Sequence, residues 1–352
     1  MAKETIAIAG AGLAGRLFAW ALSRAGHAVQ VWDAGPGPAP AFDGQGAAAF
    51  TAAGMLSPLA ELDRAEAEVA ALGFDSLRLW PAIVAALHQP VSLQTEGSLL
   101  LAHRPDQGAA ARVLQRLQQH AAHGDFPAAQ PLSAAQLREL EPALLAGPQA
   151  WLLPGEGLIN PLQAMQALHA SAHGVQWHWQ CPVAEVQAGR ITLGDGSRVK
   201  ADWSIDTRGL GARAALPLRG VRGEVVALQL AGHGLRRPLR LMHPRHCVYL
   251  VPRSADELLI GASEIESEDR SPVSLQSAVE LMAAAHSLMP QLGEARITRL
   301  DRNLRPALPH HRPHAHSAPG LIQLNGLFRH GWLLAPALVQ RLLTQTQLAR
   351  LT

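Results

Sequence analysis

The sequence contains few charged residues, only two lysines and a single tyrosine. Charged side chains make up 16% of its 352 residues and hydrophobic ones 48%, which excludes a disordered chain and is typical of a folded globular protein. The formal net charge is +2, and lysine occurs only at Lys3 and Lys200. Because this composition provides no strong positive field, we expect no nucleic-acid partner.

Cysteines and long apolar runs are also scarce. The two cysteines, Cys181 and Cys247, cannot form a disulfide framework and suit a reducing compartment. The apolar N-terminal stretch contains Arg16 and three patterned glycines but no typical cleavage site, which argues against a signal peptide. No other stretch reaches the roughly 18 uninterrupted apolar residues of a membrane helix. The sequence therefore predicts no membrane span and a cytoplasmic location.

The chain opens with the pattern of a nucleotide-binding βαβ unit. An apolar strand at 5–9 leads into Gly10, Gly12 and Gly15, then a helix, and then a second strand that ends in Asp33. The first glycine permits a tight turn, the second lets the backbone approach a pyrophosphate, and the third allows helix and strand to pack closely. Asp33 is placed to accept hydrogen bonds from a ribose hydroxyl. The alternative is a glycine-rich turn in a chain that is rich in alanine and glycine.

The fingerprint itself does not distinguish FAD from NAD. It lies at the N-terminus and occurs once, which favours tightly bound FAD, because a reductase that uses NAD(P)H usually carries a second fingerprint. The segment "DTRGLGAR" (206–213) includes Gly209 and ends a strand, but it lacks the full spacing. FAD is therefore the expected cofactor.

Helices and strands alternate in the rest of the chain. Helices are expected at 64–88, 107–122, 133–145, from Pro161, at 274–288 and from about Pro336, and strands at 98–104, 246–253, 257–263 and 320–326. Asn160 before Pro161 is a clear helix start, and Asp195-Gly196 predicts the turn of a hairpin within 190–206.

This order of elements predicts an α/β fold with discontinuous domains. We assign residues 1–85, 150–218 and 317–352 to a Rossmann-like FAD-binding domain. Residues 86–149 and 219–316 would form an inserted α+β substrate-binding domain.

Ten short segments resemble, in the same order, those of the D-amino-acid oxidase-like flavoproteins. They are the fingerprint with Asp33, "AAGMLSP" (52–58), "LEPAL" (140–144), "GLINPLQAMQAL" (157–168), "IDTRGLGA" (205–212), "RGVRGEVV" (219–226), "VYLVPR" (248–253), "LLIGASEIE" (258–266), "LRP" (304–306) and "FRHGWLLAPA" (328–337). Within that family the chain is most similar to the glycine oxidases of thiamine biosynthesis. The resemblance implies a substrate domain whose antiparallel sheet covers the flavin.

The same resemblance implies an activity. A small amino acid, glycine in the first place, would be oxidised to an imine by hydride transfer to flavin N5. O₂ would reoxidise the flavin to give H₂O₂, and the imine would hydrolyse to an oxo acid, which is glyoxylate for glycine.

The resemblance also implies which residues bind FAD. They are Gly10, Gly12, Leu13, Ala14, Gly15, Asp33, Ala34, Ala48, Ala49, Ala53, Gly54, Met55, Val183, Gly209, Leu327, Phe328, Arg329, His330, Gly331, Trp332 and Leu333. Val183 would contact the adenine through its backbone, and residues 327–333 would run along the isoalloxazine.

Four residues match the family's substrate site: Arg305, Arg329 and Tyr249, which are also the catalytic candidates, and Met55. A guanidinium suits a carboxylate substrate because its planar fork donates two parallel hydrogen bonds. The alternatives are a surface arginine for Arg305, an ordinary strand aromatic for Tyr249 and a core residue for Met55. An unpaired Arg329 would be costly to bury among apolar residues, so it should bind a carboxylate or the flavin. Once the amine is neutral, hydride transfer requires no dedicated base.

Several departures from the glycine-oxidase pattern leave the substrate open. They occur at Asn303, His310-His311, His330, Trp332 and Cys247. The alternatives are an FAD-dependent D-amino-acid or secondary-amine dehydrogenase with a non-oxygen acceptor, the flavin domain of a tRNA-modifying enzyme, and a non-catalytic flavin-binding protein. A homo-oligomeric state is left open.

A cluster of four histidines, His310, His311, His314 and His316, follows Arg305 closely. Imidazoles are zinc ligands, but no cysteine or acidic cluster nearby completes a coordination sphere. The prolines of this stretch favour an extended, solvated loop. We therefore expect no metal.

Overall fold

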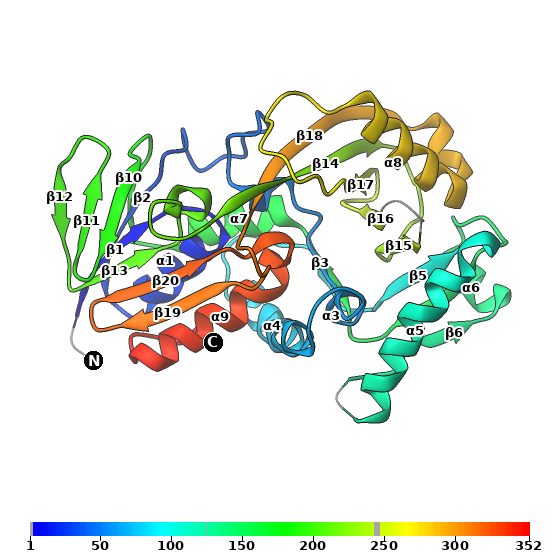
Figure 1. Ribbon diagram of the computed structural model, residues 1–352, viewed down its shortest axis with the longest axis horizontal. Coiled ribbons are helices and arrows are strands. Elements are labelled where there is room, and N and C mark those ends of the chain that lie inside the picture. The colour runs from blue at the N-terminus through cyan, green and yellow to red at the C-terminus, as the bar shows by residue number, and fades with distance from the viewer. Residues whose placement is uncertain (1–2, 125, 243–246) are drawn as a thin grey trace.

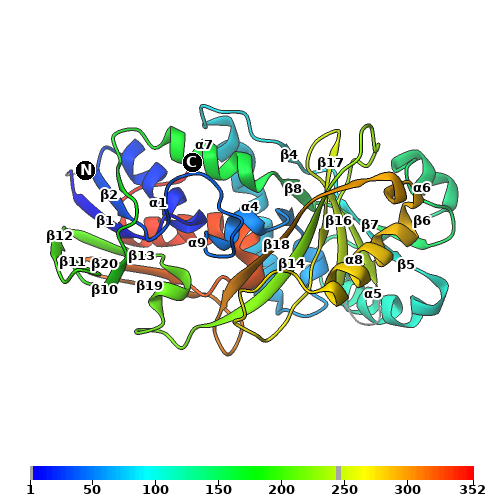
Figure 2. The ribbon, with the colours of Figure 1, turned by 90° about the horizontal axis from the view of Figure 1, so that it is seen from above.

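The computed structural model describes residues 3–124, 126–242 and 247–352. It has two lobes that lie side by side, as Figures 1 and 2 show from two directions. One lobe is built around a largely parallel sheet and the other around a larger, mostly antiparallel sheet.

Six strands form the sheet of the first lobe. In spatial order they are β19 (His314–Ala318), β20 (Leu321–Asn325), β13 (Trp203–Asp206), β1 (Thr5–Ala9), β2 (Ala28–Trp32) and β9 (Gln176–His178). All neighbours are parallel except β19 and β20. Helix α1 (Leu13–Arg24) connects β1 to β2. In open parallel sheets of this kind, ligands bind beyond the carboxyl ends of the strands.

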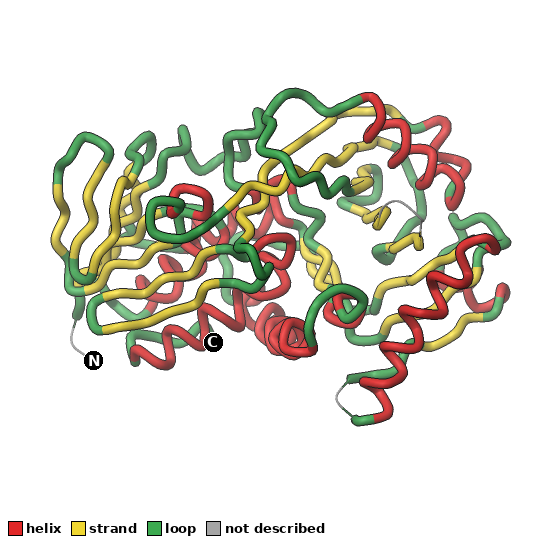
Figure 3. The backbone as a smooth tube through the Cα atoms, in the orientation of Figure 1, coloured by secondary structure: helices red, strands yellow, loops and turns green. Residues whose placement is uncertain are grey.

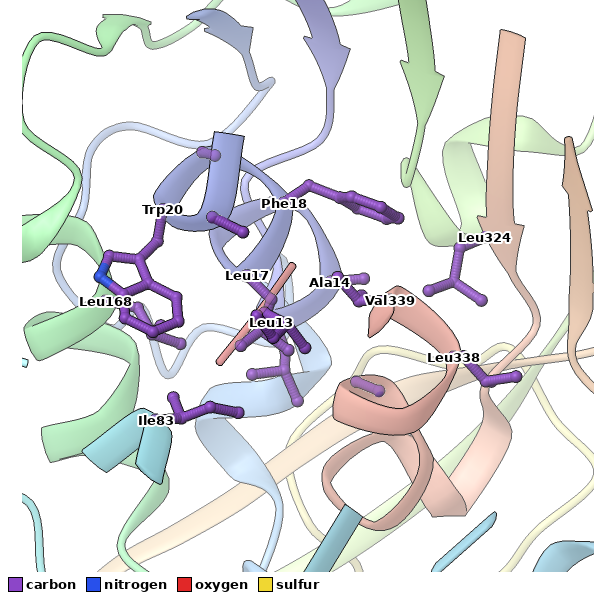
Figure 4. Packing of buried hydrophobic residues seen from close by; sticks show 14 of the residues in the cluster. Leu13, Ala14, Leu17, Phe18, Trp20, Ile83, Leu168, Leu324, Leu338 and Val339 are labelled. Atoms are coloured by element: carbon purple, nitrogen blue, oxygen red, sulfur yellow. The ribbon is translucent and has the colours of Figure 1, made fainter. Parts of the chain in front are cut away.

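Four helices bury the apolar core of this lobe: α1, α4 (Ala67–Ala85), α7 (Pro161–Ser171) and α9 (Gly331–Thr346). Figure 4 shows side chains from each of them in one cluster, among them Leu17, Ile83, Leu168 and Val339. Every residue of α1 from Leu13 to Leu22 is buried, as expected for a helix enclosed on all sides.

Eight strands form the sheet of the second lobe. In spatial order they are β18 (Arg296–Ala307), β14 (Arg219–Gln229), β17 (Glu257–Gly261), β16 (Cys247–Pro252), β15 (Leu239–Met242), β5 (Ser98–Ala102), β7 (Gln149–Leu153) and β6 (Gln130–Leu132). Helices α5 (Gln107–Ala122), α6 (Ala134–Leu140) and α8 (Leu275–Leu288) belong to this lobe. The long strands β14 and β18 pair with each other and run back toward the first lobe (Figure 1).

Smaller elements complete the fold. A three-stranded sheet of β10 (Val183–Gln187), β11 (Arg190–Leu193) and β12 (Arg198–Lys200) lies at the left edge in Figure 3. A second small sheet contains β3 (Met55–Leu56), β8 (Gly157–Ile159) and β4 (Leu93–Gln94). The short helices are α2 (Ala48–Thr51), α3 (Pro58–Glu61) and the 3₁₀ turns Arg104–Asp106, Gly209–Ala212, Pro290–Glu294 and Phe328–His330.

The last helix begins earlier than the sequence predicts. We expect it from about Pro336, but α9 starts at Gly331 and contains this proline. Proline cannot donate the hydrogen bond that the carbonyl one turn earlier would accept. In the structure the carbonyl of Trp332 accepts a bond from Trp80 Nε1 at 3.2 Å instead. A tertiary contact therefore compensates for the proline.

Two other helix ends follow local chemistry. The Asn160 side chain accepts from the backbone N–H groups of Leu162 and Gln163, so the predicted cap of α7 is confirmed. The helix predicted over 133–145 is too long, since α6 ends at Leu140. The residue before Pro142 is driven out of the helical region, which explains the earlier end.

The histidine-rich stretch is more ordered than the predicted loop. Residues up to Ala307 continue β18, and His314 with His316 lies in β19, so the loop prediction is wrong at both ends. Only the turn between these strands fits it. The hairpin turn at Asp195-Gly196 is confirmed between β11 and β12. The end of that segment instead forms β13 in the parallel sheet. Position 246, where we predicted a strand to begin, lies outside the described residues.

The division into two domains stays a prediction. Strand β7 lies in the large sheet and β19 in the parallel sheet, which would move two of the proposed boundaries by a few residues. Within the described ranges, the helices are all too short or too polar to cross a membrane.

Candidate functional site

A cavity of about 770 Å³ extends between the parallel sheet and the large antiparallel sheet. Its wall includes the turn after β1, the end of β2, helix α2, and parts of β14, β16 and β18. The volume falls within the range of cofactor and ligand pockets.

The predicted site residues converge on this cavity. Its wall contains Gly10, Gly12, Leu13, Ala14, Asp33, Ala34, Ala48, Ala49, Ala53, Gly54, Met55, Val183, Gly209, Tyr249, Arg305, Leu327, Phe328, Arg329, His330, Gly331, Trp332 and Leu333. Gly15 does not line the wall. A Cβ at Gly15 would collide with the carbonyl of Gly10, so this glycine lets α1 approach the turn after β1.

The fingerprint turn is held in place from both sides. Gly10 has a φ of +101°, a conformation that favours glycine, and its N–H donates to the Trp32 carbonyl at 2.8 Å. The buried Arg16 donates to the carbonyls of Ala11, Met165 and Pro38 at 2.7–3.0 Å. Burial lowers the pKa of Arg16 to about 10. The start of α1 is thereby presented to the cavity with its free backbone N–H groups.

Asp33 connects this turn to the loop after β2. Its carboxylate accepts from the N–H of Ala11 at 2.6 Å and from that of Gly35 at 2.7 Å. Both bonds come from backbone beside the cavity, so the orientation of the carboxylate is fixed. The arrangement suits a ribose hydroxyl as a further partner.

Side-chain hydrogen bonds also fix other segments of the cavity wall. Arg208 donates to the Val183 carbonyl at 2.9 Å, and Asn325 accepts from the Gly209 N–H at 2.8 Å. Trp332 Nε1 donates to the carbonyl of Ala49 at 3.2 Å, which joins the start of α9 to α2. These contacts connect segments that lie far apart in the sequence.

Arg305 lies on β18 and is partly buried. Its Nη1 and Nη2 donate to the Ser263 carbonyl, both at 3.1 Å, and Nη1 lies 3.4 Å from the Arg222 carbonyl. Among the described residues it forms no ion pair with a carboxylate. Burial lowers the pKa of Arg305. The guanidinium lies over Gly223 of β14, where any Cβ would collide with it.

Tyr249 lies on β16, and its ring covers Gly261 of the neighbouring strand. It packs with Met55 around a buried cluster that contains Val225. Burial raises the pKa of Tyr249, although the positive charge of Arg305 opposes this shift. The phenol is therefore neutral at physiological pH and can donate a hydrogen bond into the cavity.

Arg329 is already paired with two acidic residues that no sequence pattern predicts, Glu61 and Glu264. Its Nη2 lies 2.9 Å from Glu61 Oε2, and its Nη1 lies 3.2 Å from Glu264 Oε2. Burial alone would lower the pKa of Arg329, but Glu61 and Glu264 outweigh it and raise the pKa above its usual value. Both acids line the cavity.

Glu61 is the centre of this cluster. Besides Arg329, it contacts His330 Nε2 at 2.9 Å and Arg240 Nη2 at 3.4 Å. Burial would raise the pKa of Glu61, but His330, Arg329 and Arg240 together hold it well below its usual value. Glu61 ends α3 and is followed closely by Asp63, Glu66 and Glu68, so no local sequence signal distinguishes it from these acids.

His330 carries a buried polar atom without a protein partner. Its Nε2 faces Glu61, whereas Nδ1 is buried and has no hydrogen bond within the described part of the chain. Since buried polar groups normally have a partner, this atom fits a bound group in the cavity. The glycine-rich turn, the fixed Asp33 and this atom together are compatible with FAD.

His310, His311, His314 and His316 do not form a hydrogen-bonded cluster like the one around Glu61. His311 Nε2 lies 2.9 Å from Arg219 Nη2, and its ring packs edge-on against Phe328. In the described residues, no three histidine, cysteine or acidic side chains are placed to hold a metal ion. The side chain of Cys247 lies outside what the structure describes.

The ion pairs of Glu61 predict acid-sensitive stability. Because its folded pKa lies below the unfolded value near 4.5, its contribution is complete above that pH and is lost as the pH falls through the folded pKa. Glu61→Gln should cost about 3 kcal/mol at pH 7, since it removes the carboxylate that Arg329, Arg240 and His330 share. The difference from the wild type should shrink below pH 4.5. Urea unfolding at several pH values measures it, with exposed Glu139→Gln as the control. A difference independent of pH would contradict the assignment.

The dinucleotide fingerprint and Arg305 line one cavity, which fits a dinucleotide cofactor beside an anionic substrate. The model of the FAD dependent oxidoreductase family matches residues 5–345, and the chain belongs to this family. FAD is thus the cofactor, and both the cofactor and the enzyme class agree with the prediction from the sequence.

Within this family, the chain is similar to proteins that are named ThiO and glycine oxidase. The chain is 35% identical over 97% of its length to ThiO of Rhizobium etli, covering 97% of that protein, whose name places it in thiamine biosynthesis. It is 27% identical to a glycine oxidase of Geobacillus kaustophilus, over 95% of this chain and 90% of that one. A crystal structure of glycine oxidase from the same organism superposes with a TM-score of 0.81 at 24% identity, over 98% and 94% of the two chains. The superposition confirms the predicted fold class.

Proposed function

We propose that the protein oxidises a small amino acid, glycine in the first place, to its imine. Water then hydrolyses the imine to the oxo acid, glyoxylate for glycine, with release of ammonia, and O₂ accepts the two electrons to give H₂O₂. The similarity to ThiO and to glycine oxidase supports this reaction and a role in thiamine biosynthesis.

The observation that carries the proposal is the state of Arg305. Its guanidinium at the cavity wall donates only to carbonyl oxygens, and among the described residues no carboxylate contacts it directly. A substrate carboxylate would supply a direct ionic partner through charge-assisted hydrogen bonds. Tyr249 and Met55 lie on the same part of the wall and would limit the size of the substrate.

Orientation is the main contribution of this chain to catalysis. Bound FAD supplies the acceptor for the hydride from the substrate Cα. Arg305 would hold the substrate carboxylate, and Tyr249 would donate a hydrogen bond to the substrate from the same side. These two contacts would fix the orientation of the substrate, so that its Cα–H bond points toward the bound FAD. Glu61 and Glu264 would keep Arg329 fixed beside them.

For the cofactor, we propose three contact regions. The backbone from Gly12 to Ala14 would bind the pyrophosphate at the start of α1, and Asp33 would bind the ribose. The segment 327–333 would lie along the isoalloxazine, where the free Nδ1 of His330 would find a partner.

The test is an anaerobic titration of the FAD-loaded protein with small amino acids. We expect glycine to bleach the flavin absorbance, and air to restore it with stoichiometric H₂O₂. Bleaching by glycine that only a dye or quinone reverses would identify a dehydrogenase instead. No bleaching by glycine or by any other small amine would contradict the proposal.

A further inference from the structure

Glu264 places a carboxylate beside both arginines of the proposed substrate site. Its Oε2 lies 3.2 Å from Arg329 Nη1. It directly follows Ser263, whose carbonyl accepts both hydrogen bonds from Arg305 at 3.1 Å. The Glu264 side chain is 39% exposed, compared with 11% for Glu61, so it faces open space in the cavity wall.

The two guanidiniums therefore differ in what they can still bind. Arg329 has Nε and Nη2 directed at Glu61 and Nη1 directed at Glu264, so protein carboxylates already occupy its fork. Arg305 faces only carbonyl oxygens. Of these two arginines, only Arg305 has no carboxylate in direct contact among the described residues, so its fork is the one left for a substrate carboxylate.

We infer that Glu264 is a specificity residue that restricts the site to amines with a single carboxylate. It occupies the outward nitrogen of Arg329, and its negative charge repels a second carboxylate at that position. The inference rests on the proposed function, because it takes Arg305 as the anchor of the substrate carboxylate. Secondary amines that carry one carboxylate on each arm would be excluded on these grounds.

Replacement of Glu264 by glutamine removes the charge and keeps the shape of the side chain. The neutral amide oxygen of glutamine binds Arg329 Nη1 more weakly than a carboxylate does and does not repel a second carboxylate, so a ligand can displace it, while Glu61 still holds the other side of the guanidinium. A charge-assisted hydrogen bond to this nitrogen corresponds to a gain of at least about tenfold in affinity. A ligand with one carboxylate gains nothing from this nitrogen if Arg305 already binds it.

The experiment compares two ethers that cannot be oxidised as amines: methoxyacetate, with one carboxylate, and diglycolate, with two. Each is titrated into the FAD-loaded protein, and the change in the visible flavin spectrum gives Kd. In the wild type we expect methoxyacetate to bind at least about tenfold more tightly than diglycolate. In Glu264→Gln, the Kd for diglycolate should fall at least about tenfold, while that for methoxyacetate changes less than about threefold.

Glu266→Gln is the matched control. Glu266 lies two residues further along the same loop, is largely exposed and pairs with Arg219 at 2.9 Å. We expect it to leave both Kd values unchanged. An unchanged ratio in Glu264→Gln, or the same shift in Glu266→Gln, would overturn the inference. A wild-type protein that binds neither ether would instead contradict the proposed carboxylate site, and the inference with it.

Discussion

Arg305→Ala should weaken the binding of a carboxylate ligand by well over tenfold, while FAD remains bound. The variant loses the charge-assisted hydrogen bonds of the guanidinium, each worth about 1.5–3 kcal/mol. Tenfold in affinity corresponds to about 1.4 kcal/mol. The Kd of methoxyacetate from flavin absorbance, and the KM for glycine, measure the loss.

Two further variants show whether this loss comes from the guanidinium itself. Gly223→Ala should also weaken carboxylate binding, because the added Cβ collides with the Arg305 side chain and displaces it. Arg296→Ala removes an exposed arginine from the same strand and should change nothing. If Arg305→Ala bound methoxyacetate as tightly as the wild type does, the anchor would have to lie elsewhere.

Substitutions of two fingerprint glycines should have different effects: Gly15→Ala should lower stability as well as FAD binding, whereas Gly12→Ala should lower FAD binding alone. At Gly15, a Cβ would collide with the Gly10 carbonyl and lie 2.9 Å from Thr207 Oγ1, so Gly15→Ala should cost about 1–3 kcal/mol of stability and abolish FAD binding. At Gly12, the nearest atom to an added Cβ is 4.0 Å away. Gly12→Ala should therefore fold normally and lose at least about tenfold in FAD affinity, because the methyl group would occupy the place that we propose for the pyrophosphate.

Bound FAD after gel filtration and thermal unfolding of the apoprotein measure these two effects separately. Gly108→Ala in α5 is the control, since no atom lies within 4 Å of its added Cβ. A Gly12→Ala protein with normal FAD affinity would move the pyrophosphate away from this turn. A Gly15→Ala protein with normal stability would show that α1 can move away from β1 without a loss of unfolding free energy.

Local signals in the sequence predict much of the first lobe. The glycine spacing, the strand before it and Asp33 define the βαβ unit, and Asn160 with Pro161 defines the start of α7, because these features act within a few residues. Membership of β13 in the parallel sheet could not be predicted, since its partners β1 and β20 come from distant segments. The start of α9 cannot be predicted locally, because the contact that compensates for Pro336 comes from Trp80 in a distant helix.

The same limit applies to the site. Arg305, Tyr249 and Met55 come together at the cavity as expected, because the family resemblance supplies their positions. Glu61 and Glu264 could not be predicted as site residues, because their role follows from their ion pairs with Arg329. Arg329 lies 268 residues from Glu61 and 65 residues from Glu264 in the sequence. No local pattern reports an ion pair between such distant elements.

The wall of the cavity combines segments that are far apart in the sequence, so the cofactor site forms late during synthesis. It contains Gly10, Gly12, Leu13 and Ala14 from the first strand–helix turn and Leu324 to Leu333 from the last strand–helix connection. During synthesis the cofactor site is incomplete until the ribosome has added these last residues, and the sheet must then insert β20 beside β13. FAD should therefore bind late, and a nascent chain that stops before β20 should carry none of it.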